Sequence, residues 1–132
     1  MNKKNKGIIR ILKAFKYSFN GIVAALKNEA AFRQEIVVGT PLIILAGFLE
    51  VSPVEKCLLI GSILFIWIVE LLNSAIEECV DLASPGMHPY AKKAKDMASA
   101  AVLFAIITAV FFWVVILFPE YFYFYFFVDY EF

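Results

Sequence analysis

The sequence has few charged residues, few glycines and prolines, and almost no cysteine or histidine. Its 132 residues are 18% charged and include 6 Gly, 5 Pro, 2 Cys and 1 His, whereas a soluble domain is about 25% charged. Cys57 and Cys79 are far apart, in or beside apolar segments. This spacing excludes a disulfide framework, and we expect both side chains to pack as small hydrophobes.

Several familiar motifs are also absent. There is no Walker A sequence and no G-x-G-x-x-G, so any nucleotide site must be built without a glycine-rich phosphate loop. The N-terminal lysines precede no long apolar region with a small-residue cleavage site, so we expect no signal peptide. No internal repeat or low-complexity linker divides the chain, which predicts a single membrane domain over 1–132.

Apolar residues are abundant instead: the chain is 62% hydrophobic and 17% aromatic. Three apolar runs are long enough, or nearly so, for the about 20 residues that cross a bilayer. They predict an all-α membrane protein with three transmembrane helices, at 32–51, 56–81 and 96–118. The alternating Tyr and Phe of the tail, within 119–132, are typical of an aromatic belt at the outer interface.

The basic residues orient these spans. Eight of the twelve precede the apolar run that begins at Ile36 and three lie between the second and third spans, which leaves only Lys56 for the opposite side. The positive-inside rule therefore places the N-terminus in the cytoplasm. Before the first span, residues 6–28 repeat apolar side chains every three or four positions, which predicts an amphipathic surface helix. A simple positive-inside anchor would show the same basic residues.

The second span carries a row of polar side chains. Glu70, Ser74, Glu77 and Asp81 are spaced four, three and four apart, so they share one helix face with Asn73 at its border. A carboxylate in hydrocarbon is costly and indicates function by default. Contacts between helices are the alternative, but packing needs one polar residue rather than four.

Acids near the cytoplasmic surface favour binding of a hard cation, since Mg²⁺ prefers one or two carboxylates completed by water and phosphate oxygens. Glu29 lies just before the first span, where it can approach Glu77. Lys92, Lys93 and Lys95 precede the third span on the same side. Acids for metal beside lysines for phosphate suggest phosphoryl transfer. From the acids alone, a proton or ion relay stays open.

Three strings carry a resemblance to a known family: Asn28-Glu-Ala-Ala-Phe-Arg-Gln-Glu35, Val69-Glu-Leu-Leu-Asn-Ser-Ala-Ile-Glu77 with Val80-Asp81, and Ala94-Lys-Asp-Met-Ala-Ser-Ala-Ala-Val102. With Arg10-Ile-Leu-Lys-Ala14 and Tyr17-Ser18, they resemble the bacterial integral-membrane diacylglycerol kinases from about Arg10 to Trp113. The resemblance implies a homotrimer in the bacterial cytoplasmic membrane, with active sites between protomers at the cytoplasmic interface. It implies transfer of the γ-phosphoryl group of MgATP to diacylglycerol, giving phosphatidic acid, and no nucleic-acid partner.

The same resemblance assigns roles to residues. Glu70 matches the general base, and Glu29 and Glu77 match the metal ligands that bridge to ATP. The nucleotide-contacting positions are Arg10, Tyr17, Glu29, Glu77, His88, Lys95 and Asp96. The positions near the lipid or supporting the site are Ala14, Ser18, Ala31, Phe32, Arg33, Gln34, Glu35, Glu70, Asn73, Ser99 and Trp113. Asp81 is expected to support the helix end. A base for a lipid hydroxyl should lie deeper than the metal, and Glu70 is about two turns deeper than Glu77.

Gly86 and Met87 depart from the acidic and aromatic residues that the family has before His88, and the segment His88 to Asp96 looks more like the related undecaprenol kinases. Undecaprenol is therefore the rival substrate. A small proton- or cation-coupled transporter, with Glu70 and Glu77 as its relay, is an alternative of another class. A structural or regulatory membrane protein whose acids only pair helices is a third.

Overall fold

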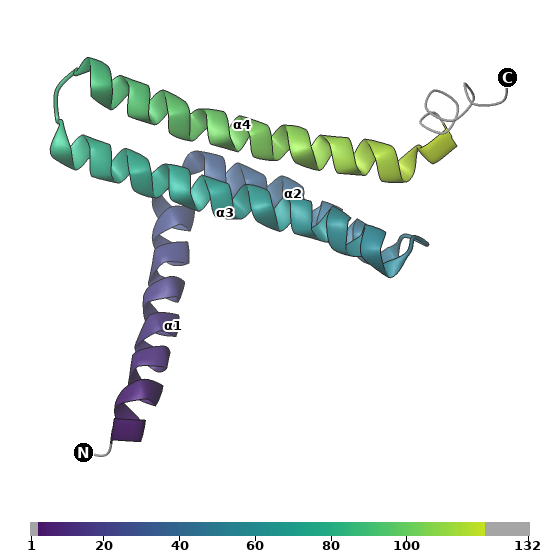
Figure 1. Ribbon diagram of the computed structural model, residues 1–132, viewed down its shortest axis with the longest axis horizontal. Helices are drawn as coiled ribbons and strands as arrows, with labels where there is room; N and C mark the ends of the chain where they lie inside the picture. Colours follow the sequence, from purple (N-terminus) through teal and green to yellow (C-terminus); the bar gives the residue numbers. More distant parts are fainter. Residues whose placement is uncertain (1–2, 121–132) are drawn as a thin grey trace, which may run out of the picture.

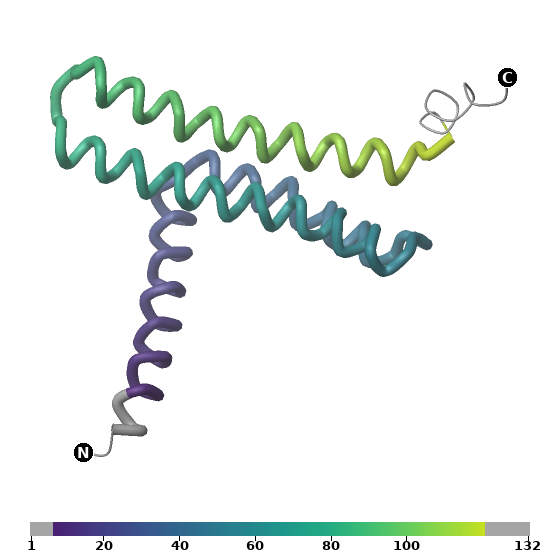
Figure 2. The backbone as a smooth tube through the Cα atoms, viewed as in Figure 1, coloured from purple at the N-terminus to yellow at the C-terminus, as the bar shows by residue number. Residues whose placement is uncertain are grey.

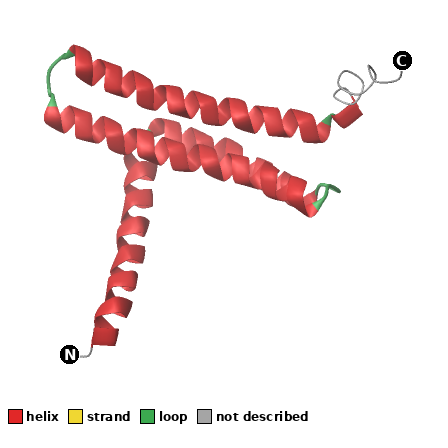
Figure 3. Cartoon of the chain, viewed as in Figure 1, coloured by secondary structure: helices red, strands yellow, loops and turns green. Residues whose placement is uncertain are grey.

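The structure is a computed structural model that describes residues 3–120, with side chains from Gly7 onward. Four helices account for nearly all of this part of the chain (Figure 1, Figure 3): α1 (Lys3–Asn28), α2 (Ala30–Phe48), α3 (Pro53–Ala83) and α4 (Pro89–Leu117). The described residues form no strand. From residue 121 onward, the predicted aromatic tail lies outside the described residues.

Helix α3 is the centre of the fold. It packs along α2 on one side and along α4 on the other, while α2 and α4 make no close backbone contact with each other within the described residues. Helix α1 leaves this three-helix bundle at a steep angle, and its N-terminal end projects away from it (Figure 2). The bundle therefore consists of α2, α3 and α4 side by side, and α1 touches it only near its C-terminal end.

Three of the four helices are long and apolar enough to cross a membrane: α2 with 19 residues, α3 with 31 and α4 with 29. The sequence predicts this number. At about 1.5 Å per residue, α3 is longer than the about 30 Å of hydrocarbon, so its ends extend beyond it. Helix α4 begins at Pro89, before the predicted span at 96–118, because a helix can start in the polar interface and continue into the membrane.

Local side-chain bonds fix where the helices begin and end. Ser52 and Glu55 form a reciprocal capping box at the start of α3, which satisfies backbone donors that have no partner in the first turn. Lys56 Nζ donates to the Gly47 carbonyl at 3.0 Å and so caps the end of α2. His88 Nδ1 accepts from the Tyr90 backbone N–H at the start of α4. These bonds fix the ends of the helices at the short α2–α3 and α3–α4 connections.

Small residues allow the helices to approach closely. Ala46, Ala98, Ala105 and Ala109 are buried, whereas many large apolar side chains are exposed in the protomer. An exposed apolar surface of this kind needs lipid or another chain to cover it. Cys57 and Cys79 are both free, and both are exposed in the single protomer. Both lie on helix faces that neither α2 nor α4 covers.

Candidate active site

The polar row of α3 lies inside the bundle. Glu70 is 4% exposed, Ser74 7% and Asn73 9%, although each is surrounded by an apolar helix sequence. The Asn73 side-chain amide donates to Glu77 Oε1 at 3.5 Å, which links the deep end of the row to its shallower end. Asn73 Oδ1 and Ser74 Oγ are buried without a hydrogen-bond partner. Buried polar atoms without partners are rare in proteins and indicate a binding site.

Further acids converge on Glu70. Glu29 and Glu77 lie close enough for their charges to act on Glu70, and Glu70 acts in the same way on Glu35. Glu29 is the single residue between α1 and α2, in an extended conformation, so the break in the helix directs it toward α3. Like charges repel one another in a poorly solvated site. This group therefore favours either a cation or protonation of its members.

The acids fit a magnesium ion bound together with a phosphate. Within the described chain, no three His, Cys, Asp or Glu side chains are grouped closely enough to hold a metal ion alone. Mg²⁺ is commonly held by one or two carboxylates plus phosphate oxygens and water, and Glu29 and Glu77 supply that number of carboxylates. The structure thus brings the predicted base and both predicted metal ligands into one region of a single chain.

Basic side chains lie beside the C-terminal end of this row. Lys95 Nζ forms an ion pair with Asp81 Oδ1 at 2.5 Å, and its charge also acts on Glu77 across the same space. A cavity of about 560 Å³ adjoins this pair and is lined by Asp81, Ser84, His88, Lys92 and Lys95 among others. Its cationic wall is suited to phosphate groups, for which a lysine acts as a point charge.

Arg33 stabilises the corner at which Glu29 is placed. Its Nη1 donates to the Leu26 carbonyl at 3.1 Å and to the Lys27 carbonyl at 3.0 Å, so it caps the C-terminus of α1 from the first turn of α2. A cation at this end also complements the helix dipole. Arg33 is predicted to lie near the lipid or to support the site, but this capping role could not be predicted, because no spacing rule relates a residue to carbonyls across a helix break.

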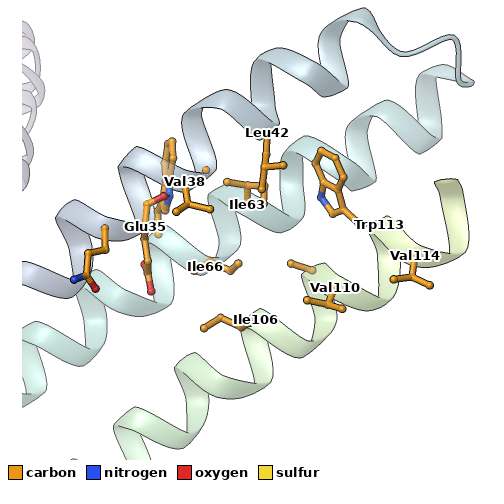
Figure 4. Close-up of a pocket in the computed structure, with 13 residues that line it drawn as sticks. Glu35, Val38, Leu42, Ile63, Ile66, Ile106, Val110, Trp113 and Val114 are labelled. Carbon is orange, nitrogen blue, oxygen red and sulfur yellow. The ribbon is translucent and has the colours of Figure 1, made fainter.

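A groove runs between α2 and α4, with α3 as its floor (Figure 4). Its volume is about 470 Å³, and side chains from all three helices face it, including Val38, Ile66, Ile106 and Val110. Glu35, Gln34 and Trp113 are the polar members of this lining. Glu35 Oε2 and Trp113 Nε1 are buried there without partners. The groove thus joins an apolar channel to an acidic side chain whose charge acts on Glu70.

Trp67 also lines this groove, although it is not among the site residues predicted from the sequence. Its indole N–H donates to the Glu35 carbonyl at 3.2 Å, so it ties α3 to α2 beside the acidic end of the groove. This contact could not be predicted, because a tryptophan inside an apolar run looks the same in the sequence whether it bonds to a neighbouring helix or faces the membrane.

The remaining predicted residues are more dispersed. Arg10, Ala14 and Tyr17 are exposed on the projecting part of α1. Ser18 instead lines a second cavity, between α1 and α3, with Glu29 and Ser74. Phe32 is buried, whereas Ala31 and Ser99 are exposed. Asp96 is exposed and pairs with Lys92. The single chain therefore brings the acids together without the N-terminal nucleotide positions.

The chain is similar to known proteins over most of its length. The model of the family described as prokaryotic diacylglycerol kinase matches residues 16–117. A diacylglycerol kinase of Escherichia coli strain K12 is 46% identical over 121 residues, which cover 92% of this chain and 99% of the relative. One from Pseudomonas aeruginosa is 47% identical over 115 residues, covering 87% and 94%. One from Helicobacter pylori strain J99 is 43% identical over 110 residues, covering 83% and 86%.

The family match includes α2, α3 and α4 in full and the C-terminal half of α1. All the acids that converge on Glu70 lie within it. The chain therefore belongs to the prokaryotic diacylglycerol kinase family.

Proposed function

We propose that this protein is a membrane lipid kinase that transfers the γ-phosphoryl group of ATP to the hydroxyl of diacylglycerol, giving phosphatidic acid. The observation that supports it most is the buried Glu70, which lies along α3 between the residues that line the apolar groove and those that line the cationic cavity. The acyl chains of a lipid alcohol need an apolar environment, and the phosphates of a nucleoside triphosphate need a cationic one. The base that joins their chemistry belongs between the two. The family match supports the same reaction.

The residues divide the reaction between them. Glu70 accepts the proton of the lipid hydroxyl, because it is the most buried of the described carboxylates and a base must lie within hydrogen-bond reach of the proton that it removes. The groove of α2 and α4 holds the acyl portion of the lipid, with Glu35 and Trp113 at its polar positions. Lys95, with the loop around His88, receives the phosphates in the adjoining cavity.

Glu29 and Glu77 would hold Mg²⁺, which supplies neutralisation of phosphate charge when it is bound with ATP. The mutual repulsion of these acids supports this assignment, since a divalent cation relieves it. Asn73 keeps the Glu77 carboxylate oriented through its amide. Arg33 keeps Glu29 at the α1–α2 corner.

The assembly follows from the projecting α1. We infer that α1 lies in the cytoplasmic interface of the bacterial inner membrane as an amphipathic helix, and that three protomers associate with active sites between them. The support is that Arg10 and Tyr17 are exposed on α1, whose N-terminal end projects away from the bundle (Figure 1). The excess of basic residues on the α1 side supports a cytoplasmic site.

Lipid phosphorylation in mixed micelles tests this function. Purified protein with MgATP and diacylglycerol should form phosphatidic acid. The kcat/KM for diacylglycerol should be higher than the kcat/KM for undecaprenol. A preference for undecaprenol would move the chain to the related substrate. The transporter would be favoured instead if the protein phosphorylated neither lipid but conducted cations across liposomes without ATP. That flux should then be lost in Glu70→Gln.

A further inference from the structure

One carboxylate of the polar row has no part in the reaction described above. Asp81 is 63% exposed at its side chain and lies in the last turns of α3. Its partner Lys95 lies on α4, beyond the connection that contains Ser84 and His88. The pair therefore closes the cytoplasmic end of the α3–α4 hairpin. Exposed ion pairs contribute little to stability, so a purely structural purpose is a weak explanation for it.

The pair determines where the Lys95 ammonium lies. A lysine has a long flexible stem and three N–H donors. Asp81 accepts one of these bonds at 2.5 Å, which leaves the other two for a further ligand. In this position the ammonium faces the cavity beside His88 and its charge acts on Glu77.

The other lysine of the cavity is arranged differently. Lys92 pairs with Asp96, one turn further along its own helix, so that pair fixes the side chain along α4 and not across the hairpin. Lys95 is thus the cation that bridges the end of the acidic row and the wall of the cavity. Its position depends on a residue of another helix.

We propose that Asp81 is a positioning residue for phosphoryl transfer, which holds the Lys95 ammonium between Glu77 and the cavity so that the phosphates of ATP meet a cation already in place. The inference rests on the proposed kinase function. It assigns Asp81 no contact with the nucleotide or the lipid, and it makes the effect of Asp81 dependent on Lys95.

Steady-state kinetics of Asp81→Asn test the proposal. We expect the KM for MgATP to rise about two- to fivefold, because the Lys95 ammonium loses the fixed geometry that an exposed ion pair gives it. The KM for diacylglycerol should not change. Asp81→Glu, which keeps the charge, should give an intermediate KM for MgATP. Glu78→Gln is the matched control, since Glu78 is exposed on the same end of α3 and forms no ion pair with the described residues.

A double variant separates positioning from stability. Lys95→Met alone should raise the KM for MgATP, and adding Asp81→Asn to it should raise the KM no further. Equal KM values for Asp81→Asn and Glu78→Gln would overturn the proposal. So would full additivity in the double variant, or a drop in thermal stability of Asp81→Asn with an unchanged KM.

Nucleotide binding keeps this test distinct from the proposed function. Calorimetric titration with Mg²⁺ and a non-hydrolysable ATP analogue should show weaker binding for Asp81→Asn than for Glu78→Gln. If the parent protein bound the analogue with this difference but phosphorylated no lipid, the kinase function would fail while the positioning role of Asp81 stood. Equal binding by both variants would overturn the positioning role alone.

Discussion

At the scale of the residue, the chemistry depends on how differently the carboxylates of α3 are surrounded. Glu70 is buried and acted on by two other acids, whereas Glu78, one residue from Glu77, is exposed. Burial without a fixed counter-charge is unfavourable for the ionised form, which favours a functional role for Glu70 over a structural one. Glu77 is half-buried and bonded by Asn73, which suits binding of a cation.

Replacing each acid by its amide distinguishes these roles. Glu70→Gln should lower kcat by about 10²- to 10⁴-fold, the usual contribution of a general base, and leave binding of MgATP unchanged. Glu77→Gln should raise the KM for MgATP and the concentration of Mg²⁺ needed for half-maximal rate. Initial rates over a matrix of both substrates measure this. Glu50→Gln, an exposed acid between α2 and α3, is the control, and near-normal kcat in Glu70→Gln would contradict the assignment.

At the scale of the element, one glycine sets the distance between α2 and α3. A Cβ added at Gly39 would lie 2.7 Å from Ile63 Cγ2 and 3.0 Å from the Trp67 ring. No real Cβ approaches so closely, so the absence of a side chain permits this crossing. The bond from Trp67 to the Glu35 carbonyl lies on the same side of α2. The spacing between α2 and α3 therefore determines where Glu35 lies at the acidic end of the groove.

Gly39→Ala should reduce stability by about 1–3 kcal/mol, since overpacking displaces Ile63 or the indole ring. Gly47→Ala in the same helix meets nothing within 4 Å and should be neutral or stabilising by up to about 1 kcal/mol, because alanine is the better helix former. Thermal inactivation in detergent micelles compares the two. Equal effects would show that helix propensity, and not the α2–α3 contact, governs Gly39.

The elements themselves follow from the sequence, but their contacts do not. Apolar runs and the capping residues Ser52 and His88 are local signals, so three helices long enough to span and their short connections can be predicted. The 3.6-residue period also places Glu70, Asn73 and Ser74 on one face. Pairing of Asp81 with Lys95, capping by Arg33 and the seating of Trp67 on Gly39 depend on helix crossing, which no single-sequence period encodes.

At the scale of the whole molecule, one protomer leaves apolar surfaces uncovered. The groove between α2 and α4 is open along the side where these helices do not meet, and large apolar side chains such as Phe104 and Phe111 are exposed. Helix α1, on which Arg10 and Tyr17 are exposed, projects away from the three-helix bundle (Figure 1). A symmetric assembly would bring α1 of one copy to the acids of the next.

Mixing two inactive variants tests that arrangement. Arg10→Met removes a nucleotide position from α1, and Glu77→Gln removes a metal ligand from α3, so each alone should be nearly inactive. If α1 completes the site of a neighbour, trimers reassembled from an equal mixture should regain about a quarter of the parent activity, because one interface in four pairs an intact α1 with an intact α3. Two copies of the same variant, mixed and reassembled in the same way, are the control. Absence of any recovery would place Arg10 and Glu77 in the site of one chain, and α1 would then have to fold back over its own bundle during the reaction.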